Sequence, residues 1–394
     1  MAFRNAVSRG KDAPSSPKAA TIFGICSVIF AMRRPVEEQP GLFGGDIRLR
    51  PARSVPLVGE QNDIRYYAAA PRSILNGPKA TGMGFWSINP YVGCALGCAY
   101  CYARYAHRYA AERLATAARL DGGDHLPTDE MPPWLAFERR IMVKREAPAL
   151  VRRELGRAAT LHALRGEYVV IGTATDPYQP AERRFRITRG ILEVLSEQKD
   201  ICVSIITKSP LITRDVDLLT RINERSRLSV HVSLITIDRE LARCLEPRAP
   251  TPEARLRAIR RLRQHGISVG VNAMPVLPGI TDAPEMIEEL VIALKDADAS
   301  YVSACALRLR ATARDRYVPF IASTFPELAG RYARAYAQSH QVSEHYRKGL
   351  RDRFVKLCAQ YGLAFGRPGD DENDTGESDI AAGGSETDQF GLAL

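Results

Sequence analysis

The sequence of 394 residues predicts an α/β fold based on a partial or full barrel of parallel strands. Between Phe85 and Leu309, short apolar runs rich in β-branched residues alternate with amphipathic stretches, which is typical of repeated βα units. About six such repeats are present, and barrels of this kind place their chemistry at the carboxyl ends of the strands. No segment has the roughly 18 consecutive apolar residues that a membrane-spanning helix needs, so we expect no membrane association.

The expected strands are apolar runs such as YVVIGT and VHVSLIT. They cover Gly84–Ile88, Ile141–Val143, Tyr168–Thr173, Val203–Thr207, Ser229–Leu234, Val269–Pro275 and Tyr301–Ala306. The expected helices cover Glu182–Gln198, Thr213–Arg225, Pro252–Gly266, Asp282–Ala297, Phe325–Ser339 and His345–Tyr361. Thr213 is a suitable N-cap residue, and Gly266 is a suitable residue for a helix C-terminus.

The composition divides the chain into five parts. We expect an irregular N-terminal extension over 1–40, a lead-in rich in Gly, Pro and Arg over 41–84, and the core barrel over 85–309. A helical extension is expected over 310–365, followed by a disordered acidic tail over 366–394.

Near the N-terminus, Thr21–Met32 is apolar and short, like the core of a signal peptide. Arg33 and Arg34 follow it, and no small-x-small cleavage site stands there. We therefore expect that Met32 is the true start and that residues 1–31 are an extension.

The net charge of +10 is unevenly distributed. Residues 366–394 contain eight acidic residues and one arginine, so residues 1–365 carry a net charge of about +17. A body this basic attracts polyanions, nucleic acid first. The alternative is a general preference for arginine, which greatly outnumbers lysine here.

Three of the eight cysteines, Cys94, Cys98 and Cys101, lie within eight residues. The others are scattered, mostly in apolar surroundings, which does not resemble a disulfide framework in a chain of this length. The pattern indicates a reduced, cytoplasmic protein with one metal site.

The three clustered cysteines stand in the segment NPYVGCALGCAYCY, which directly follows an expected strand. Thiolates at C-x3-C-x2-C spacing bind three irons of a [4Fe–4S] cubane and leave the fourth iron open. S-adenosylmethionine (SAM) can chelate that iron through its amino and carboxylate groups, and an electron passed to SAM then releases a 5′-deoxyadenosyl radical. Gly93 and Gly97 permit the tight backbone of such a loop.

Two alternatives remain for these cysteines. Zinc requires a fourth Cys or His ligand, which His107 can supply six residues after Cys101. The three thiols can also be ordinary core residues.

The cluster motif and several further strings resemble the radical SAM superfamily and, within it, its spore photolyase-like group. The resemblance runs from about Ser73 to Gly362 and includes GTATDPYQPAERR, ITKSPLITRD, EPRAPTPEARL and MPVLPGITD. It implies a partial (β/α)6 barrel, a [4Fe–4S] cluster on the three cysteines, SAM, and an electron donor such as flavodoxin or ferredoxin.

The resemblance also implies a set of SAM-binding residues. The loop after the second barrel strand contains Thr173, Thr175 and Asp176, where spore photolyase-like proteins have polar SAM contacts. Lys208 and Ser233 match residues that bind the SAM carboxylate. The structural alternatives are a solvated strand end for Lys208 and a turn for Ser233.

Tyr100 and Tyr102 flank the last cluster cysteine, and by the same resemblance they lie near the path of hydrogen return as catalytic residues. The alternative is that they pack the loop. Arg104 and His107 follow on an expected helix, where they either approach a substrate phosphate or stabilise the cluster.

One position departs from the group. Spore photolyase-like proteins donate a hydrogen atom from a cysteine where this chain has Thr173, and a hydroxyl cannot replace a thiol in that step. Cys202, Cys244 and Cys305 are the candidate substitutes. Three functions follow: a radical SAM enzyme acting on nucleic acid, as in DNA repair; one acting on a peptide or small molecule; or a non-catalytic iron–sulfur or zinc protein.

Overall fold

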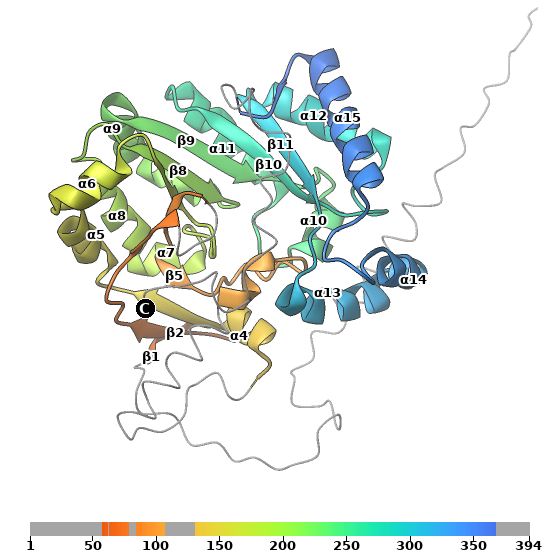
Figure 1. Cartoon of the computed structure of the whole chain (residues 1–394), viewed down its shortest axis with the longest axis horizontal. Coiled ribbons are helices and arrows are strands. Elements are labelled where there is room, and N and C mark those ends of the chain that lie inside the picture. The colour runs from red at the N-terminus through yellow and green to blue at the C-terminus, as the bar shows by residue number, and fades with distance from the viewer. Residues whose placement is uncertain (1–56, 62, 79–83, 107–130, 368–394) are drawn as a thin grey trace, which may run out of the picture.

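The computed structural model describes residues 57–61, 63–78, 84–106 and 131–367, which form an open, curved sheet with helices along its outer face (Figure 1). The predictions for residues 1–40, for His107 and for nearly all of the acidic tail lie outside the described residues. Among the described residues, no helix is both long enough and apolar enough to cross a membrane.

The main sheet has eight strands in the order β12-β11-β10-β9-β8-β7-β4-β3. Its strands are β3 (Leu75–Asn76), β4 (Trp86–Ile88), β7 (Tyr168–Ile171), β8 (Cys202–Thr207), β9 (Arg227–Ser233), β10 (Val269–Val276), β11 (Tyr301–Ala306) and β12 (Ala364–Phe365). All neighbouring pairs are parallel except β3 with β4. Because β12 does not pair with β3, the sheet is a partial barrel with six principal parallel strands, as the sequence predicts.

A second, four-stranded sheet includes the strand that directly precedes the three clustered cysteines. It has the order β1-β2-β6-β5, with β1 (Leu57–Gln61), β2 (Ile64–Ala69), β5 (Tyr91–Val92) and β6 (Arg140–Lys144). The interpretation of Ile141–Val143 as a barrel strand is therefore wrong. These residues do form part of a strand, β6. This strand pairs with β2 and β5 and not with a strand of the main sheet, a pairing that the sequence did not predict.

Helices and two 3-10 turns connect the strands. They are η2 (Tyr102–Arg104), α4 (Pro133–Arg139), α5 (Ala147–Leu155), α6 (Ala158–Leu164), α7 (Pro180–Phe185), α8 (Ile187–Leu195), η3 (Pro210–Asp215), α9 (Val216–Arg225), α10 (Arg239–Leu245), α11 (Pro252–Gln264) and α12 (Pro284–Asp296). The helices cover the outer face of the main sheet, where Val203, Val230, Val271 and Val302 are fully buried. The opposite face lines the barrel interior and carries polar residues such as His231, Asn272 and Ser303, which are partly exposed.

Two of the expected helices differ in detail from the structure. The expected helix Glu182–Gln198 is split into α7 and α8 at Arg186, whose φ of 54° is left-handed. Thr213 is not an N-cap, because it lies inside η3, which Ser209 caps by accepting a hydrogen bond from the Leu211 amide. Gly266 does follow the end of α11 with a φ of +72°, as predicted.

The last described residues form a helical group at one end of the molecule (Figure 1). It consists of α13 (Ala311–Thr324), α14 (Pro326–Ala335) and α15 (Glu344–Tyr361). Helix α13 contacts η2 and α4, which flank the cysteine loop, and α15 packs on α12 and β11. The helical extension thus reaches the immediate surroundings of the predicted metal site.

Candidate active site at the cysteine loop

The three clustered cysteines lie in the turn between β5 and η2. Cys94 and Cys98 are 8% and 6% exposed, and Cys101 is partly buried. The loop is anchored at its start, where the Cys94 amide donates to Phe137 O at 2.8 Å, and at its end, where the Cys101 amide donates to Cys98 O at 3.3 Å.

Burial raises the pKa of all three thiols. The pKa of Cys94 rises to about 12, chiefly through desolvation and then through the charge of Asp176. For Cys98, desolvation and the charge of Glu246 outweigh the opposing influence of Lys208. Without a metal these thiols stay protonated, and metal binding would displace their protons.

The donor set of the loop is three thiols, which is the donor type that both zinc and iron–sulfur clusters take. Within the described ranges, no three His, Cys, Asp or Glu side chains are gathered closely enough to hold one metal ion. The fourth ligand proposed for zinc, His107, lies outside the described residues. The assignment of Cys94, Cys98 and Cys101 as cluster ligands stays a prediction.

The loop after β7 is joined to the cysteine loop by side-chain hydrogen bonds. Asn89 Nδ2 donates to Thr173 Oγ1 at 3.0 Å, and Asn89 Oδ1 accepts from the Ala174 amide at 2.9 Å. Thr175 Oγ1 donates to Gly93 O at 2.6 Å, and Gln179 Oε1 accepts from the Ala95 amide at 2.9 Å. The hydroxyls of Thr173 and Thr175 therefore position the two loops relative to each other.

Asp176 connects the ends of β7 and β8. Its Oδ1 accepts from the Tyr178 amide at 2.8 Å and from Thr207 Oγ1 at 2.7 Å, and its Oδ2 accepts from the Lys208 amide at 2.7 Å. The pKa of Asp176 is raised by desolvation, although all three hydrogen bonds act to lower it. The side chain thus fixes the backbone at the base of Lys208.

Glu246, which the sequence did not single out, is the centre of a buried charge cluster. It is 1% exposed, lies 3.3 Å from Lys208 Nζ, pairs with Arg255 and accepts a hydrogen bond from the Tyr100 hydroxyl. Desolvation opposes its ionisation, but Arg255 and Lys208 outweigh it and lower the pKa of Glu246 to about 2. Burial likewise acts to lower the pKa of Lys208, but the charge of Glu246 reverses the direction and raises it.

The two candidate tyrosines face different surroundings. Tyr100 is 5% exposed, and Lys208 Nζ lies 5.6 Å from the centre of its ring. Tyr102 has a half-exposed ring, and its hydroxyl donates to Thr173 O. Desolvation is the main cause that raises the pKa of Tyr102, followed by the charges of Tyr105, Cys101 and Cys305. Cys305 belongs to β11.

Ser233 ends β9 and is 8% exposed. Its carbonyl accepts a hydrogen bond from Arg255 Nη1 at 3.0 Å, and its strand neighbour is Asn272. Cys202 and Cys244, the other candidate hydrogen donors, are 4% and 7% exposed.

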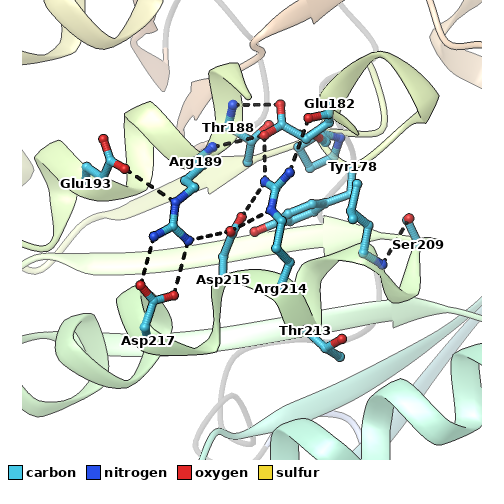
Figure 2. Close-up of polar contacts among 12 residues, drawn as sticks. Tyr178, Glu182, Thr188, Arg189, Glu193, Ser209, Thr213, Arg214, Asp215 and Asp217 are labelled. Carbon is cyan, nitrogen blue, oxygen red and sulfur yellow. Dashed lines mark hydrogen bonds and ion pairs between the residues drawn. The ribbon is translucent and has the colours of Figure 1, made fainter. Parts of the chain in front are cut away.

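A second ionic network joins α7, α8 and η3, as Figure 2 shows. Buried Glu182 accepts from Tyr91 Oη at 2.5 Å and from Arg214 Nη2 at 2.9 Å. Arg214 and Arg189 both bind Asp215, at 2.7 and 2.8 Å. Because Tyr91 directly precedes the cysteine loop, this network links that loop to α7 and η3.

Gly93 and Gly97 both have positive φ, at 88° and 67°. A Cβ on Gly93 would lie 2.8 Å from Phe137 O, and one on Gly97 would lie 2.5 Å from Arg248 Nη2. The glycines are therefore required for conformation and for space, which supports the prediction of a tight loop.

The structure gathers the predicted cluster cysteines, the two tyrosines and the predicted SAM-binding residues at the carboxyl edge of the main sheet, whereas Cys202 begins β8 and lies at the opposite edge. It adds Asn89, Gln179, Glu246 and Arg255, whose side chains hold the predicted residues in place. Asn89 lies in the NPYVGC string, and Glu246 and Arg255 both lie in EPRAPTPEARL. The resemblance therefore included these three residues, but it did not show which side chains they contact.

Comparison with known proteins identifies the core segment. The family model described as "Radical SAM superfamily" matches residues 88–291. An uncharacterised protein of Mycobacterium tuberculosis is 34% identical over 332 residues, covering 84% of this chain and 90% of that protein. An uncharacterised protein of Methanocaldococcus jannaschii is 26% identical over 202 residues, covering 51% of this chain and 64% of that protein.

Among solved structures, a cysteine-to-serine mutant of spore photoproduct lyase superimposes with a TM-score of 0.50 and 14% identity, covering 76% of this chain and 81% of that chain. Another mutant, with bound AdoMet and dinucleoside spore photoproduct, also gives 0.50 and 14%, covering 81% of this chain and 87% of that chain. At this identity the match concerns the fold, which is that of the partial barrel.

Proposed function

The chain belongs to the radical SAM superfamily, whose members use a [4Fe–4S] cluster and SAM, and from this premise we propose that Cys94, Cys98 and Cys101 hold the cluster and that the enzyme modifies a nucleic acid. The observation that carries the first part is the burial of these thiols in a loop whose Tyr100 ring centre lies 5.6 Å from Lys208 Nζ, at the edge where parallel barrels place their chemistry. When bound, the cluster supplies the electron that cleaves SAM to methionine and a 5′-deoxyadenosyl radical.

The residues around the loop bind and orient SAM. Lys208 offers a cation that can approach a carboxylate, and Glu246 holds its ammonium group in place. Thr173 and Thr175 fix the loop after β7 against the cysteine loop, and Asp176 fixes that loop to the end of β8. Ser233 ends β9, the next strand of the sheet. Tyr102, half exposed beside Cys305, is the side chain best placed to contact the substrate.

Charge and surface shape support a nucleic acid substrate. Residues 1–365 carry about +17, and the helical group contributes exposed basic side chains on α14 and α15 such as Arg331, Arg334 and Lys348. A groove of about 570 Å³ between these helices is lined by Arg334, Arg347 and polar residues. A structural neighbour with the same fold was solved with a dinucleoside spore photoproduct, which agrees with a substrate that contains nucleosides.

Repair of the spore-type lesion itself is not proposed. The Thr173 hydroxyl, which stands where a donor cysteine is expected, accepts a hydrogen bond from Asn89 and so serves to hold the loop. We therefore propose modification or repair of a different base.

The test of the cofactor assignment is anaerobic reconstitution with iron and sulfide, followed by reduction with dithionite in the presence of SAM. We expect 5′-deoxyadenosine by mass spectrometry, and loss of both the brown colour and this product in Cys94→Ala, Cys98→Ala and Cys101→Ala. Cys358→Ala is the matched control, because Cys358 is a buried cysteine of α15 outside the loop. Full activity in a loop variant would contradict the assignment.

The substrate class is tested by the salt dependence of DNA and RNA binding. A phosphate contact removed by Arg331→Gln or Arg334→Gln should lower the slope of log K against log salt by about 1. Glu327→Gln on the same helix is the control and should leave the slope unchanged. Binding without salt dependence, together with SAM cleavage stimulated by a peptide, would favour the second substrate class.

A further inference from the structure

Three arginines from different parts of the chain converge on the single carboxylate of Glu138, on α4. Arg104 Nη2 lies 2.7 Å from Glu138 Oε1, and Arg248 Nη2 lies 2.8 Å from Glu138 Oε2. Arg316 Nε, on α13, lies 3.7 Å from Oε1. Three positive charges against one negative charge leave an excess of two at this point.

This arginine cluster (Arg104, Arg248, Arg316 and Glu138) lies directly against the cysteine loop. Arg104 Nη2 donates to Cys98 O at 2.6 Å, and Arg248 Nε donates to Ala95 O at 2.5 Å. Gly97 fits between them, since a Cβ there would meet both Arg248 and Glu138. A single layer of side chains therefore separates the backbone of the loop from the outer surface.

Two of the four side chains reach solvent. Those of Arg248 and Arg316 are 29% and 24% exposed, whereas those of Arg104 and Glu138 are 0% and 6% exposed. The Arg316 guanidinium lies 5.4 Å from the centre of the Trp134 ring, and its Nε has no hydrogen-bond partner among the described residues. The excess charge is thus presented outward beside an aromatic ring.

The charge cluster of the barrel interior is a separate set. Lys208, Arg255 and Tyr100 meet at Glu246 and share no residue with the arginine cluster. The interior set belongs to the proposed SAM site, so the arginine cluster is available for another partner.

We propose that the surface formed by Arg248, Arg316 and Trp134 is the docking site for an acidic one-electron donor protein of the flavodoxin class. The proposal rests on the proposed function, because only a cluster at the cysteine loop needs such a donor. A positive patch steers an acidic partner, and Arg248, which is partly exposed and donates to Ala95 O, places this surface against the backbone of the loop. One electron would leave the anionic flavin hydroquinone, which becomes the neutral flavin radical, and would reduce the cluster that Cys94, Cys98 and Cys101 are proposed to hold; no proton moves.

The test compares Arg316→Gln with Arg257→Gln, which removes the same charge from an exposed position on α11. Flavodoxin binding to the reconstituted protein is measured by interferometry at 50 and 200 mM salt. We expect the Kd to rise about fivefold at low salt in Arg316→Gln, to return in Arg316→Lys, and to stay unchanged in Arg257→Gln. An equal effect of both glutamine variants, or of neither, would overturn the proposal.

Electron delivery provides the second measurement. Flavodoxin-driven release of 5′-deoxyadenosine should fall in Arg316→Gln while dithionite-driven release stays at the wild-type level. If dithionite supports no release in the wild type, the proposed function fails, and the binding measurement still decides the docking site. If Arg316→Gln instead weakens DNA binding and leaves flavodoxin binding intact, the surface belongs to nucleic acid and this proposal is overturned.

Discussion

The ammonium group of Lys208, at the end of β8, lies 3.3 Å from the carboxylate of Glu246, which follows α10. Thirty-eight positions separate them in the sequence, yet the pair is buried together beside Tyr100. Glu246 supplies the counter-charge that lets Lys208 remain ionised at low exposure, and so keeps a cation ready for an incoming carboxylate.

Lys208→Ala should raise the Kd for SAM by about tenfold, because a charge-assisted contact to a carboxylate is lost. The cluster spectrum should stay the same, since Lys208 holds none of the cysteines. Equilibrium dialysis with SAM and an absorption spectrum measure the two effects. Lys295→Ala, which removes an exposed lysine bound to Gly362 O, is the control, and an equal effect there would contradict the role of Lys208.

Glu246→Gln should lower the free energy of unfolding by about 3 kcal/mol, because it leaves Lys208 and Arg255 buried without their carboxylate. Urea unfolding followed by circular dichroism measures the change. Glu197→Gln breaks the exposed pair with Arg152 and should have no measurable effect. Equal stability of the two variants would mean that the buried cluster does not depend on Glu246.

Gly93→Ala should abolish cluster assembly, because the new methyl group would lie 2.8 Å from the backbone oxygen of Phe137 and 3.1 Å from Ile141 Cδ1. Gly166→Ala is a matched control, since Gly166 also has positive φ, at 78°, but has nothing within 4 Å of an added Cβ. The control loses only the backbone free energy of a positive φ, about 1–2 kcal/mol. Iron content after reconstitution distinguishes the two variants, and normal iron in Gly93→Ala would refute the close contact.

Stability should fall as the pH is lowered from about 6.5 to 4, partly through His231. Folding lowers the pKa of His231 to about 4, first through burial and then through the charge of Arg367. Across this window the unfolded chain binds a proton there that the folded chain does not, which costs about 2 kcal/mol. His231→Asn should flatten the dependence measured by urea unfolding, whereas replacement of exposed His265 should not.

The sequence predicted the parts of the fold that local pattern determines. Six parallel barrel strands were found because β-branched runs recur between amphipathic stretches. The pattern did not reveal that Ile141–Val143 joins another sheet, since strand character does not specify a pairing partner. The break at Arg186 was also missed, because the amphipathic period continues across a single left-handed residue.

The site was predictable to a similar degree. Cysteine spacing marked the loop, and the resemblance to spore photolyase-like proteins marked Asp176, Lys208 and Ser233. The residues that position them were not predictable from spacing, since Glu246, Arg255 and Glu138 act through contacts far apart in the sequence. Such partners follow from the tertiary structure alone.

The main sheet ends at β12 on one side and β3 on the other, and among the described residues no ladder joins these edges. A closed barrel can widen only by breaking a full row of backbone hydrogen bonds, at about 1 kcal/mol for each. Between the described strands β12 and β3 there is no such row to break, so backbone hydrogen bonds do not fix the circumference of the sheet along this seam.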